Sequence, residues 1–181
     1  MKFLVNLLTT IRIILAFFIF GLIMQSNGYV LAFILFMFAG ITDFLDGYLA
    51  RRYNLQSVIG EILDPIADKI LIVFILFALA INLSSYIVGF FASLIISREI
   101  LVSALRDYNS RNNNTSATKV TFLAKFKTTS QIFTISLYLF ALAINSMLLL
   151  IISDLFLAIS TIITLYTGYI YIYNSVPKER D

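Results

Sequence analysis

The sequence predicts an all-α membrane protein with six transmembrane helices in a single domain that covers residues 1–181. Three observations support this fold class. Hydrophobic residues make up 60% of the chain and charged residues 13%, whereas soluble domains average about 45–50% and about 25%. A chain of 181 residues is too short to hide so much apolar surface in one core. The apolar residues also fall into runs close to the roughly 20 residues that a membrane-spanning helix needs.

Six apolar runs follow one another along the chain, and short polar stretches separate them. The first run carries Arg12, the second ends with Asp43 and Asp46, and the third begins with Asp64 and Asp68. Turns rich in Ser, Asn and Gly close the first, third and fifth runs, whereas longer polar connections follow the second and fourth. The predicted spans are residues 7–24, 29 into the 40s, 60–81, 86–105, 126–144 and 147–173.

The N-terminal segment resembles the start of a signal peptide, because Lys2 is followed by an apolar run. Arg12 interrupts that run, and no A-x-A cleavage site follows it. We therefore expect a retained helix, or an interfacial segment that leads into the first span.

Lysine and arginine residues are divided unequally between the two ends of the predicted spans. The turns at 26–28, 82–85 and 145–146 contain none, whereas the termini and the connections at 51–57 and 106–119 are basic. The positive-inside rule places both termini and these two connections in the cytoplasm. The net charge of +3 does not indicate a nucleic-acid partner, because the basic residues sit in short loops between apolar spans.

The chain contains neither cysteine nor histidine. Disulfides, thiolate metal sites, histidine-ligated zinc and Ser-His-Asp catalysis are therefore excluded within it. A bound metal would need oxygen ligands, and a general base would be Asp, Glu, Lys or Tyr.

Four of the ten acidic residues gather around one predicted cytoplasmic connection. Asp43 and Asp46 are three residues apart, and Asp64 and Asp68 are four apart, so each pair shares one face of a helix. If the two helices pack as neighbours, four carboxylates converge, and an all-oxygen site of this kind favours Mg²⁺, Mn²⁺ or Ca²⁺. Salt bridges to nearby cations are the alternative, with Arg51, Arg52 and Lys69 as the partners.

Small residues extend this acidic pattern, and they would also suit close packing between helices. The full string reads Asp43-x2-Asp46-Gly47-x2-Ala50-Arg51-x8-Gly60-x3-Asp64-x3-Asp68. It resembles the signature of the CDP-alcohol phosphatidyltransferases at all eight defining positions. Members of that family use an alcohol acceptor and a divalent metal to displace CMP from a CDP-linked lipid. The resemblance implies six membrane helices, a site that faces the cytoplasm and a homodimer.

The resemblance also implies a role for each position of the string. Asp43, Asp46, Asp64 and Asp68 would be metal ligands for Mg²⁺ or Mn²⁺, with two ions expected, and Asp68 would also be the general base. Two metal ions about 3.5–4 Å apart can clamp a pyrophosphate. The residues implied for the CDP site are Asp46, Gly47, Ala50, Arg51 and Gly60.

Three stretches outside the signature resemble the phosphatidylglycerophosphate synthase subfamily, namely residues 64–69, 97–106 and 125–131. Residues 6–12 resemble its N-terminal motif, although the proline often found there is absent, and Ala124 stands where glycine is common. The implied acceptor is glycerol 3-phosphate, and the alternative is a sister enzyme of the cardiolipin synthase or phosphatidylinositol phosphate synthase type. Cations on the predicted cytoplasmic side would bind the acceptor phosphate, and they are Arg98, Arg106, Lys125 and Lys127.

Two alternatives remain open at this point. Positive-inside topology or contact with anionic lipid would also explain the basic residues, and Arg98 beside Glu99 would also suit a structural ion pair. A small cation transporter would use the acidic cluster as an ion site. The four clustered Asp lie near one membrane face, however, and only Asp154 falls in the opposite half.

The sequence also leads us to expect particular partners and a location. The expected partners are CDP-diacylglycerol, glycerol 3-phosphate, membrane lipid and a second copy of the chain. The expected location is the bacterial cell (inner) membrane with the active site facing the cytoplasm, because no Arg- and Ser-rich transit segment is present.

Overall fold

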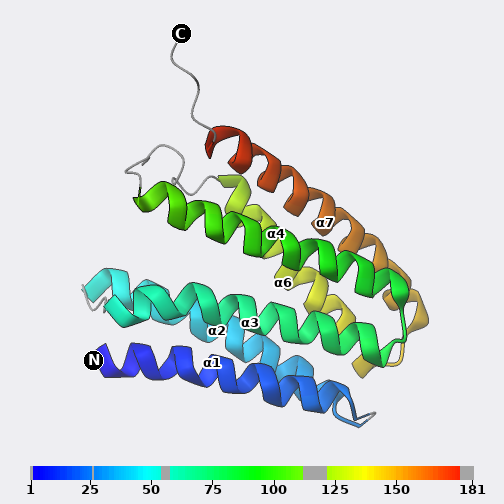
Figure 1. The fold of residues 1–181 in the computed structure, drawn as a ribbon. Helices are drawn as coiled ribbons and strands as arrows, with labels where there is room; N and C mark the ends of the chain where they lie inside the picture. The colour runs from blue at the N-terminus through cyan, green and yellow to red at the C-terminus, as the bar shows by residue number, and fades with distance from the viewer. Residues whose placement is uncertain (1, 26, 54–57, 112–121, 176–181) are drawn as a thin grey trace.

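The computed structural model describes residues 2–25, 27–53, 58–111 and 122–175, with their side chains apart from those of residues 2–8, 44–53, 58–62 and 122–125. Within these ranges the chain forms six α-helices and no strand, so the predicted all-α class is confirmed. In chain order they are α1 (Lys2–Ile23), α2 (Tyr29–Tyr53), α3 (Val58–Asn82), α4 (Tyr86–Arg111), α6 (Phe122–Ala143) and α7 (Met147–Ser175) (Figure 1).

Several helices extend beyond the predicted spans. Helix α1 begins at Lys2, so the N-terminal segment continues the first helix. Helix α4 continues to Arg111 through a polar stretch that was expected to be a connection. There Arg111 pairs with Asp107 one turn earlier at 2.8 Å, and both side chains are exposed. Polar residues can prolong a helix past the apolar region, because their side chains reach water while the backbone stays hydrogen-bonded.

The surface of the bundle is strongly apolar. Helices α4 and α7 are each long and apolar enough to cross a membrane, and shorter apolar stretches cover Thr9–Ile23 and Tyr29–Asp43. Large apolar side chains are exposed on every described helix, for example Phe17, Phe38, Phe77, Phe90, Phe133 and Leu155. Contiguous exposed apolar surface of this kind marks a membrane or interaction surface.

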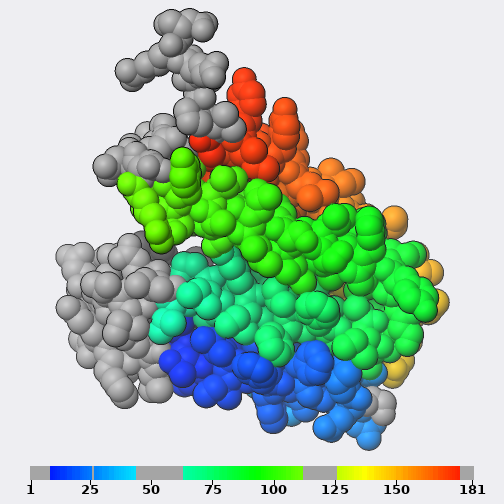
Figure 2. Space-filling view, in the orientation of Figure 1, coloured from blue at the N-terminus to red at the C-terminus, as the bar shows by residue number. Residues whose placement is uncertain are grey.

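Helix α3 is central to the packing. It contacts α1, α4 and α6, while α1 also packs on α2, and α7 packs on both α4 and α6. Figure 2 shows α1, α3, α4 and α7 side by side on one face of the molecule. The buried core includes Ile19, Ile75, Leu79, Ile95 and Leu139, which come from four different helices. This arrangement leaves the N-terminal half of α3 between α1 and α4.

Two of the tight turns are built alike. The second residue after the helix adopts the left-handed conformation, namely Ser84 after α3 (φ 48°) and Asn145 after α6 (φ 53°). The next residue is a serine in both turns, Ser85 or Ser146, and its N–H donates to a carbonyl five residues earlier, at 3.2 Å and 3.0 Å. The hydroxyls of these serines cap the next helices.

The turn between α1 and α2 depends on close backbone contact. A Cβ atom on Gly28 would lie 2.2 Å from the carbonyl oxygen of Leu22, so no other residue fits there without movement. All three tight turns lie at the same end of the bundle, opposite the N-terminus (Figure 1). The helices therefore form three hairpins, α1/α2, α3/α4 and α6/α7, and the residues predicted to be functional lie toward the other end.

Candidate active site

A cluster of carboxylates lies where α1, α2 and α3 meet. Arg12 from α1 pairs with two of them, since its Nη2 lies 2.8 Å from Asp43 Oδ1 and its Nη1 lies 2.9 Å from Asp68 Oδ1. Thr9, one turn before Arg12, donates its hydroxyl hydrogen to Asp64 Oδ1 at 2.5 Å. We call these five residues the acidic cluster.

Burial differs sharply within the acidic cluster. The Arg12 side chain is only 2% exposed, whereas the side chains of Asp43 and Asp68 are 42% and 43% exposed. A buried guanidinium is stable only when it is paired, and Arg12 meets this condition through one carboxylate on each of two other helices. Each of these carboxylates is therefore held by Arg12 and remains partly exposed.

The convergence of the carboxylates was predicted on the condition that the two acidic helices pack as neighbours. In the described part of the chain α2 packs on α1 and α6 instead of α3. Helix α1 joins the two acidic helices through Arg12, so Asp43 and Asp68 converge on a cation from a third helix. Lys69, one of the cations named in the salt-bridge alternative, donates from Nζ to Ser103 Oγ on α4 at 2.6 Å.

Several predicted site residues lie outside the described side chains. Helix α2 continues through the positions of Asp46, Gly47, Ala50 and Arg51, and α3 begins before Gly60, but nothing can be assigned to these side chains. The side chains of Lys125 and Arg52 also lie outside the described ones.

The donor chemistry of the acidic cluster suits a hard divalent cation, because its acidic ligands offer only oxygen. Among the described side chains, no group of three or more acidic residues is arranged so that it could hold a metal ion. Asp46, the fourth predicted ligand, is not among them. The residue types therefore fit Mg²⁺ or Mn²⁺. The complete set of four predicted ligands includes Asp46, whose side chain is not described.

A second cluster lies on the other side of α3, between α4, α6 and α7. Arg98 Nη1 pairs with Glu99 Oε1 at 3.1 Å, and Arg98 Nη2 donates to Thr167 Oγ1 at 3.0 Å. Lys127 from α6 also pairs with Glu99 Oε1. Lys69 interacts electrostatically with Glu99, Arg98 and the exposed Arg106. We call this group the basic cluster; its members are Lys69, Arg98, Glu99, Arg106 and Lys127.

The basic cluster brings together three of the predicted acceptor residues: Arg98 and Lys127, which are buried, and Arg106, which is exposed. The structural ion pair between Arg98 and Glu99 that the sequence analysis left open is present. In the motif at residues 125–131, Lys127 and Gln131 lie one helical turn apart. Their side chains therefore share one face of α6, and both are buried. Gln131 Nε2 donates to Thr164 Oγ1 on α7 at 3.0 Å.

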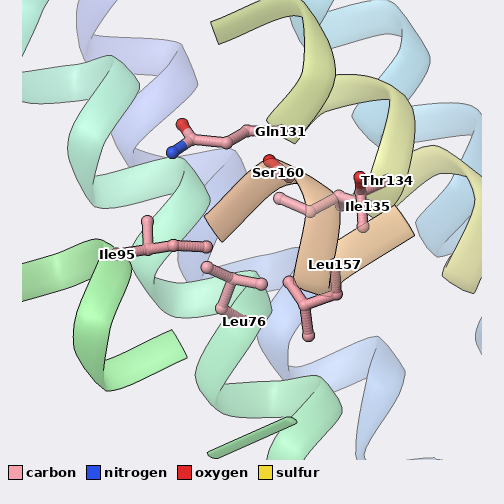
Figure 3. Close-up of a pocket in the computed structure, with 7 residues that line it drawn as sticks. All are labelled: Leu76, Ile95, Gln131, Thr134, Ile135, Leu157 and Ser160. Carbon is pink, nitrogen blue, oxygen red and sulfur yellow. The ribbon is translucent and has the colours of Figure 1, made fainter. Parts of the chain in front are cut away.

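Deeper in the bundle, a narrow crevice runs between α3, α4, α6 and α7 (Figure 3). It is too narrow to admit a water molecule. We interpret it as a packing seam rather than a binding pocket. Its lining residues are Leu76, Ile95, Gln131, Thr134, Ile135, Leu157 and Ser160.

Three residues in or beside these clusters had no role assigned to them from the sequence: Thr9, Arg12 and Thr167. A signal was available for the first two, because an arginine inside an apolar span requires a buried partner. Glu99 was considered only as an ion-pair partner of Arg98, and its contact with Lys127 spans 28 residues of sequence. No local pattern marked Thr167.

An all-helical chain with a strongly apolar surface and two charged clusters on either side of one helix has the character of a membrane enzyme that handles charged head groups. The chain belongs to the CDP-alcohol phosphatidyltransferase family, because the sequence model of that family matches residues 2–167. The family resemblance of the acidic string is thereby confirmed.

Individual relatives carry a more specific name. The chain is 37% identical over 179 residues to a CDP-diacylglycerol–glycerol-3-phosphate 3-phosphatidyltransferase of Rickettsia felis, which covers 94% of this chain and 93% of the relative. Enzymes of the same name from Haemophilus influenzae and Escherichia coli are 38% and 37% identical. These two matches cover 72% and 70% of this chain and the same shares of the relatives.

Proposed function

We propose that this chain transfers the phosphatidyl group of CDP-diacylglycerol to glycerol 3-phosphate, giving phosphatidylglycerophosphate and CMP. The observation that carries the proposal is the similarity along 94% of the chain to a relative of that name. The subfamily motifs at 64–69, 97–106 and 125–131 support the same acceptor. The shared name of the relatives favours this activity over a sister transferase and over a cation transporter.

The reaction exchanges one phosphate–oxygen bond for another. The acceptor hydroxyl oxygen attacks the β-phosphorus of CDP-diacylglycerol, and the bond from that phosphorus to the oxygen of CMP breaks. We assign Asp68 as the general base that takes the hydroxyl proton, because a chain without histidine relies on a carboxylate for this step. Arg12 holds Asp68 Oδ1 at 2.9 Å, so the proton would pass to Oδ2.

Asp43, Asp46, Asp64 and Asp68 would hold two divalent cations, Mg²⁺ or Mn²⁺. When bound, such ions neutralise a pyrophosphate and stabilise the departing phosphate oxygen. Chelation with EDTA should abolish activity and lower the melting temperature, and Mg²⁺ or Mn²⁺ should restore both. Full activity after rigorous chelation would contradict the metal assignment.

The CDP moiety would bind beside the acidic cluster, along the C-terminal half of α2 and the first turn of α3. Small residues at Gly47, Ala50 and Gly60 would let the nucleotide approach the backbone closely. Asp46 and Arg51 complete the proposed CDP site, since a guanidinium can donate two parallel hydrogen bonds to a phosphate.

The basic cluster would bind the phosphate of glycerol 3-phosphate, together with Lys125. Lys69, Arg98, Arg106 and Lys127 contribute four positive charges against the one carboxylate of Glu99, so these five side chains carry a net charge of +3. Such an excess attracts a phosphate dianion. Asp68 and Lys69 are consecutive residues of α3, and this supports a base that lies close to the proposed acceptor site.

We further propose six membrane spans with both termini in the cytoplasm, in the inner membrane of a bacterial cell, and a homodimer. The exposed apolar side chains on every described helix and the unequal distribution of Lys and Arg support this topology. Cysteines introduced at Ser57 or Asn113 should react only from the cytoplasmic side, and those at Asn27 or Ser84 only from outside. Labelling of Ser57→Cys from outside would reverse the orientation.

An acceptor panel tests the function directly. Purified protein with CDP-diacylglycerol and Mg²⁺ would be offered glycerol 3-phosphate, inositol phosphate, serine and phosphatidylglycerol in turn, and CMP release would be measured. We expect release with glycerol 3-phosphate and the phosphorylated lipid as the product. A preference for phosphatidylglycerol or inositol phosphate would overturn the proposed acceptor while leaving the family unchanged.

A further inference from the structure

Gly168 on α7 lies directly against Arg98. A Cβ atom at this position would lie 2.9 Å from Arg98 Cγ and 3.0 Å from Arg98 Nε, closer than real Cβ contacts. Gly168 does not have a positive φ angle, so its backbone conformation does not require glycine. A glycine inside a helix costs stability relative to alanine. The missing side chain therefore makes room for Arg98.

The other helical glycines whose surroundings the structure describes lack this constraint. A Cβ atom on Gly21 would have nothing within 4 Å, and on Gly89 it would only touch Ala80 Cβ at 3.9 Å. The contact at Gly168 is consequently a feature of the Arg98 site rather than of helix packing in general.

The neighbouring residue, Thr167, fixes the guanidinium from the same turn of α7. Its hydroxyl donates to the carbonyl oxygen of Thr164 at 2.9 Å, so its lone pairs are available to accept from Arg98 Nη2 at 3.0 Å. Glu99 holds Nη1. The third donor, Arg98 Nε, is buried and has no hydrogen-bond partner in the described part of the chain. A buried donor without a partner is unusual and suggests a ligand.

We propose that Thr167 and Gly168 are positioning residues for the acceptor subsite. Gly168 leaves the space that Arg98 occupies, and Thr167 holds Nη2, so that the guanidinium keeps its place beside Lys127 in the proposed phosphate site. This inference rests on the proposed function, in which Arg98 binds the phosphate of glycerol 3-phosphate. It adds α7 to a subsite that the sequence had placed on α4 and α6 alone.

Gly168→Ala tests the inference, with Gly89→Ala as the matched control on α4. The added methyl group should displace Arg98 and raise the KM for glycerol 3-phosphate by about tenfold, as expected for a lost hydrogen bond to a charged group. The KM for CDP-diacylglycerol should change less than about twofold, because no hydrogen bond from Arg98 to that substrate is proposed. Thr167→Val removes the acceptor of Arg98 Nη2 at nearly constant shape, and it should act in the same direction if Gly168→Ala fails to fold.

A double-mutant cycle separates positioning from general packing damage. In an Arg98→Ala background the added methyl group has space, so Gly168→Ala should cause no further rise in the KM for glycerol 3-phosphate. Additive effects of the two substitutions would overturn the positioning role. An effect of Gly168→Ala no larger than that of Gly89→Ala would overturn it as well.

The same measurements distinguish this inference from the proposed function. If Arg98→Ala raises the KM for both substrates equally, the assignment of the acceptor phosphate to Arg98 is wrong, and with it the inference. If Arg98→Ala acts selectively on glycerol 3-phosphate but neither Gly168→Ala nor Thr167→Val does, only the inference about α7 is wrong.

Discussion

On one side of α3 two carboxylates pair with a single buried cation, and on the other side two cations pair with a single partly buried carboxylate. Arg12 joins α1 to α2 and α3 in the acidic cluster, and Glu99 joins α4 to α6 in the basic cluster. The central Arg12 is more buried than the carboxylates that it pairs with, whereas Glu99 is slightly more exposed than Arg98 and Lys127. Each cluster therefore has an excess of one charge, which suits its proposed ligand. A single opposite charge, Arg12 or Glu99, holds the helices together.

The largest effect is expected when the acidic cluster loses a reacting group. Asp68→Asn keeps the shape of the side chain but removes its capacity to accept a proton, so turnover should fall by about 10²–10⁴-fold. Affinity for CDP-diacylglycerol at saturating Mg²⁺ should be largely retained. Asp154→Asn is the control, because Asp154 lies on α7 and accepts a hydrogen bond from Tyr138. Near-normal turnover in Asp68→Asn would show that Asp68 is not the base.

The next effect concerns the cation at the centre of the acidic cluster. Arg12→Ala leaves Asp43 and Asp68 without their shared partner, and it should lower the free energy of unfolding by about 2–4 kcal/mol. Thermal unfolding in detergent without metal would measure this. Arg111→Ala, which breaks an exposed pair, should cost no more than about 0.5 kcal/mol.

Added Mg²⁺ provides a second measurement on the same variants. A divalent cation can replace the missing charge, so Mg²⁺ should raise the melting temperature of Arg12→Ala more than that of the native chain. An equal rise in both would argue that Arg12 does not balance the carboxylates that bind metal.

The basic cluster should also lose stability when its central charge is removed, but an anion rather than a cation should restore it. Glu99→Gln removes the charge that Arg98 and Lys127 share, and it should lower the free energy of unfolding by about 1–3 kcal/mol. Inorganic phosphate, rather than Mg²⁺, should recover stability in this variant. Asp107→Asn serves as the control, because Asp107 pairs with Arg111 at an exposed position. Recovery by Mg²⁺ alone would remove the contrast between the two clusters.

The smallest effect is expected far from both clusters, in the tight turns. Ser84 and Asn145 have positive φ angles, which glycine adopts without strain. Ser84→Gly should therefore stabilise the protein by at most about 1 kcal/mol and leave the KM of both substrates unchanged. A change in either KM would show that the turns and the clusters are coupled.

Much of the fold could be predicted from the sequence because membrane helices are long, apolar and punctuated by polar turns. The three turns and the approximate extent of each helix follow from that pattern alone. The order of packing does not, because it depends on contacts between distant side chains. The sequence therefore left open whether α2 and α3 are neighbours, and in the described part of the chain α1 joins them.

The candidate site was predictable to a similar degree. Asp43, Asp64 and Asp68 stood out because carboxylates near a membrane are costly and must have a function or a partner. The identity of the partner was not predictable, since Arg12 precedes Asp68 by 56 residues. Gly168 carried no signal, because a glycine in an apolar helix becomes meaningful only when the side chain it faces is known.

The three hairpins have a consequence for assembly. In the proposed topology each hairpin exposes only a short turn on the far side, and none of these turns contains lysine or arginine. A lysine or arginine in such a turn would have to cross the bilayer during insertion, at a cost of about 2.5–3.5 kcal/mol at its centre. These turns avoid that cost. Each helix pair can therefore enter the membrane on its own. The charged contacts then join different pairs, since Arg12 of the first hairpin meets Asp68 of the second, and Arg98 of the second meets Thr167 of the third. The residues proposed for chemistry are thus also those that unite three separately inserted pairs into one protein.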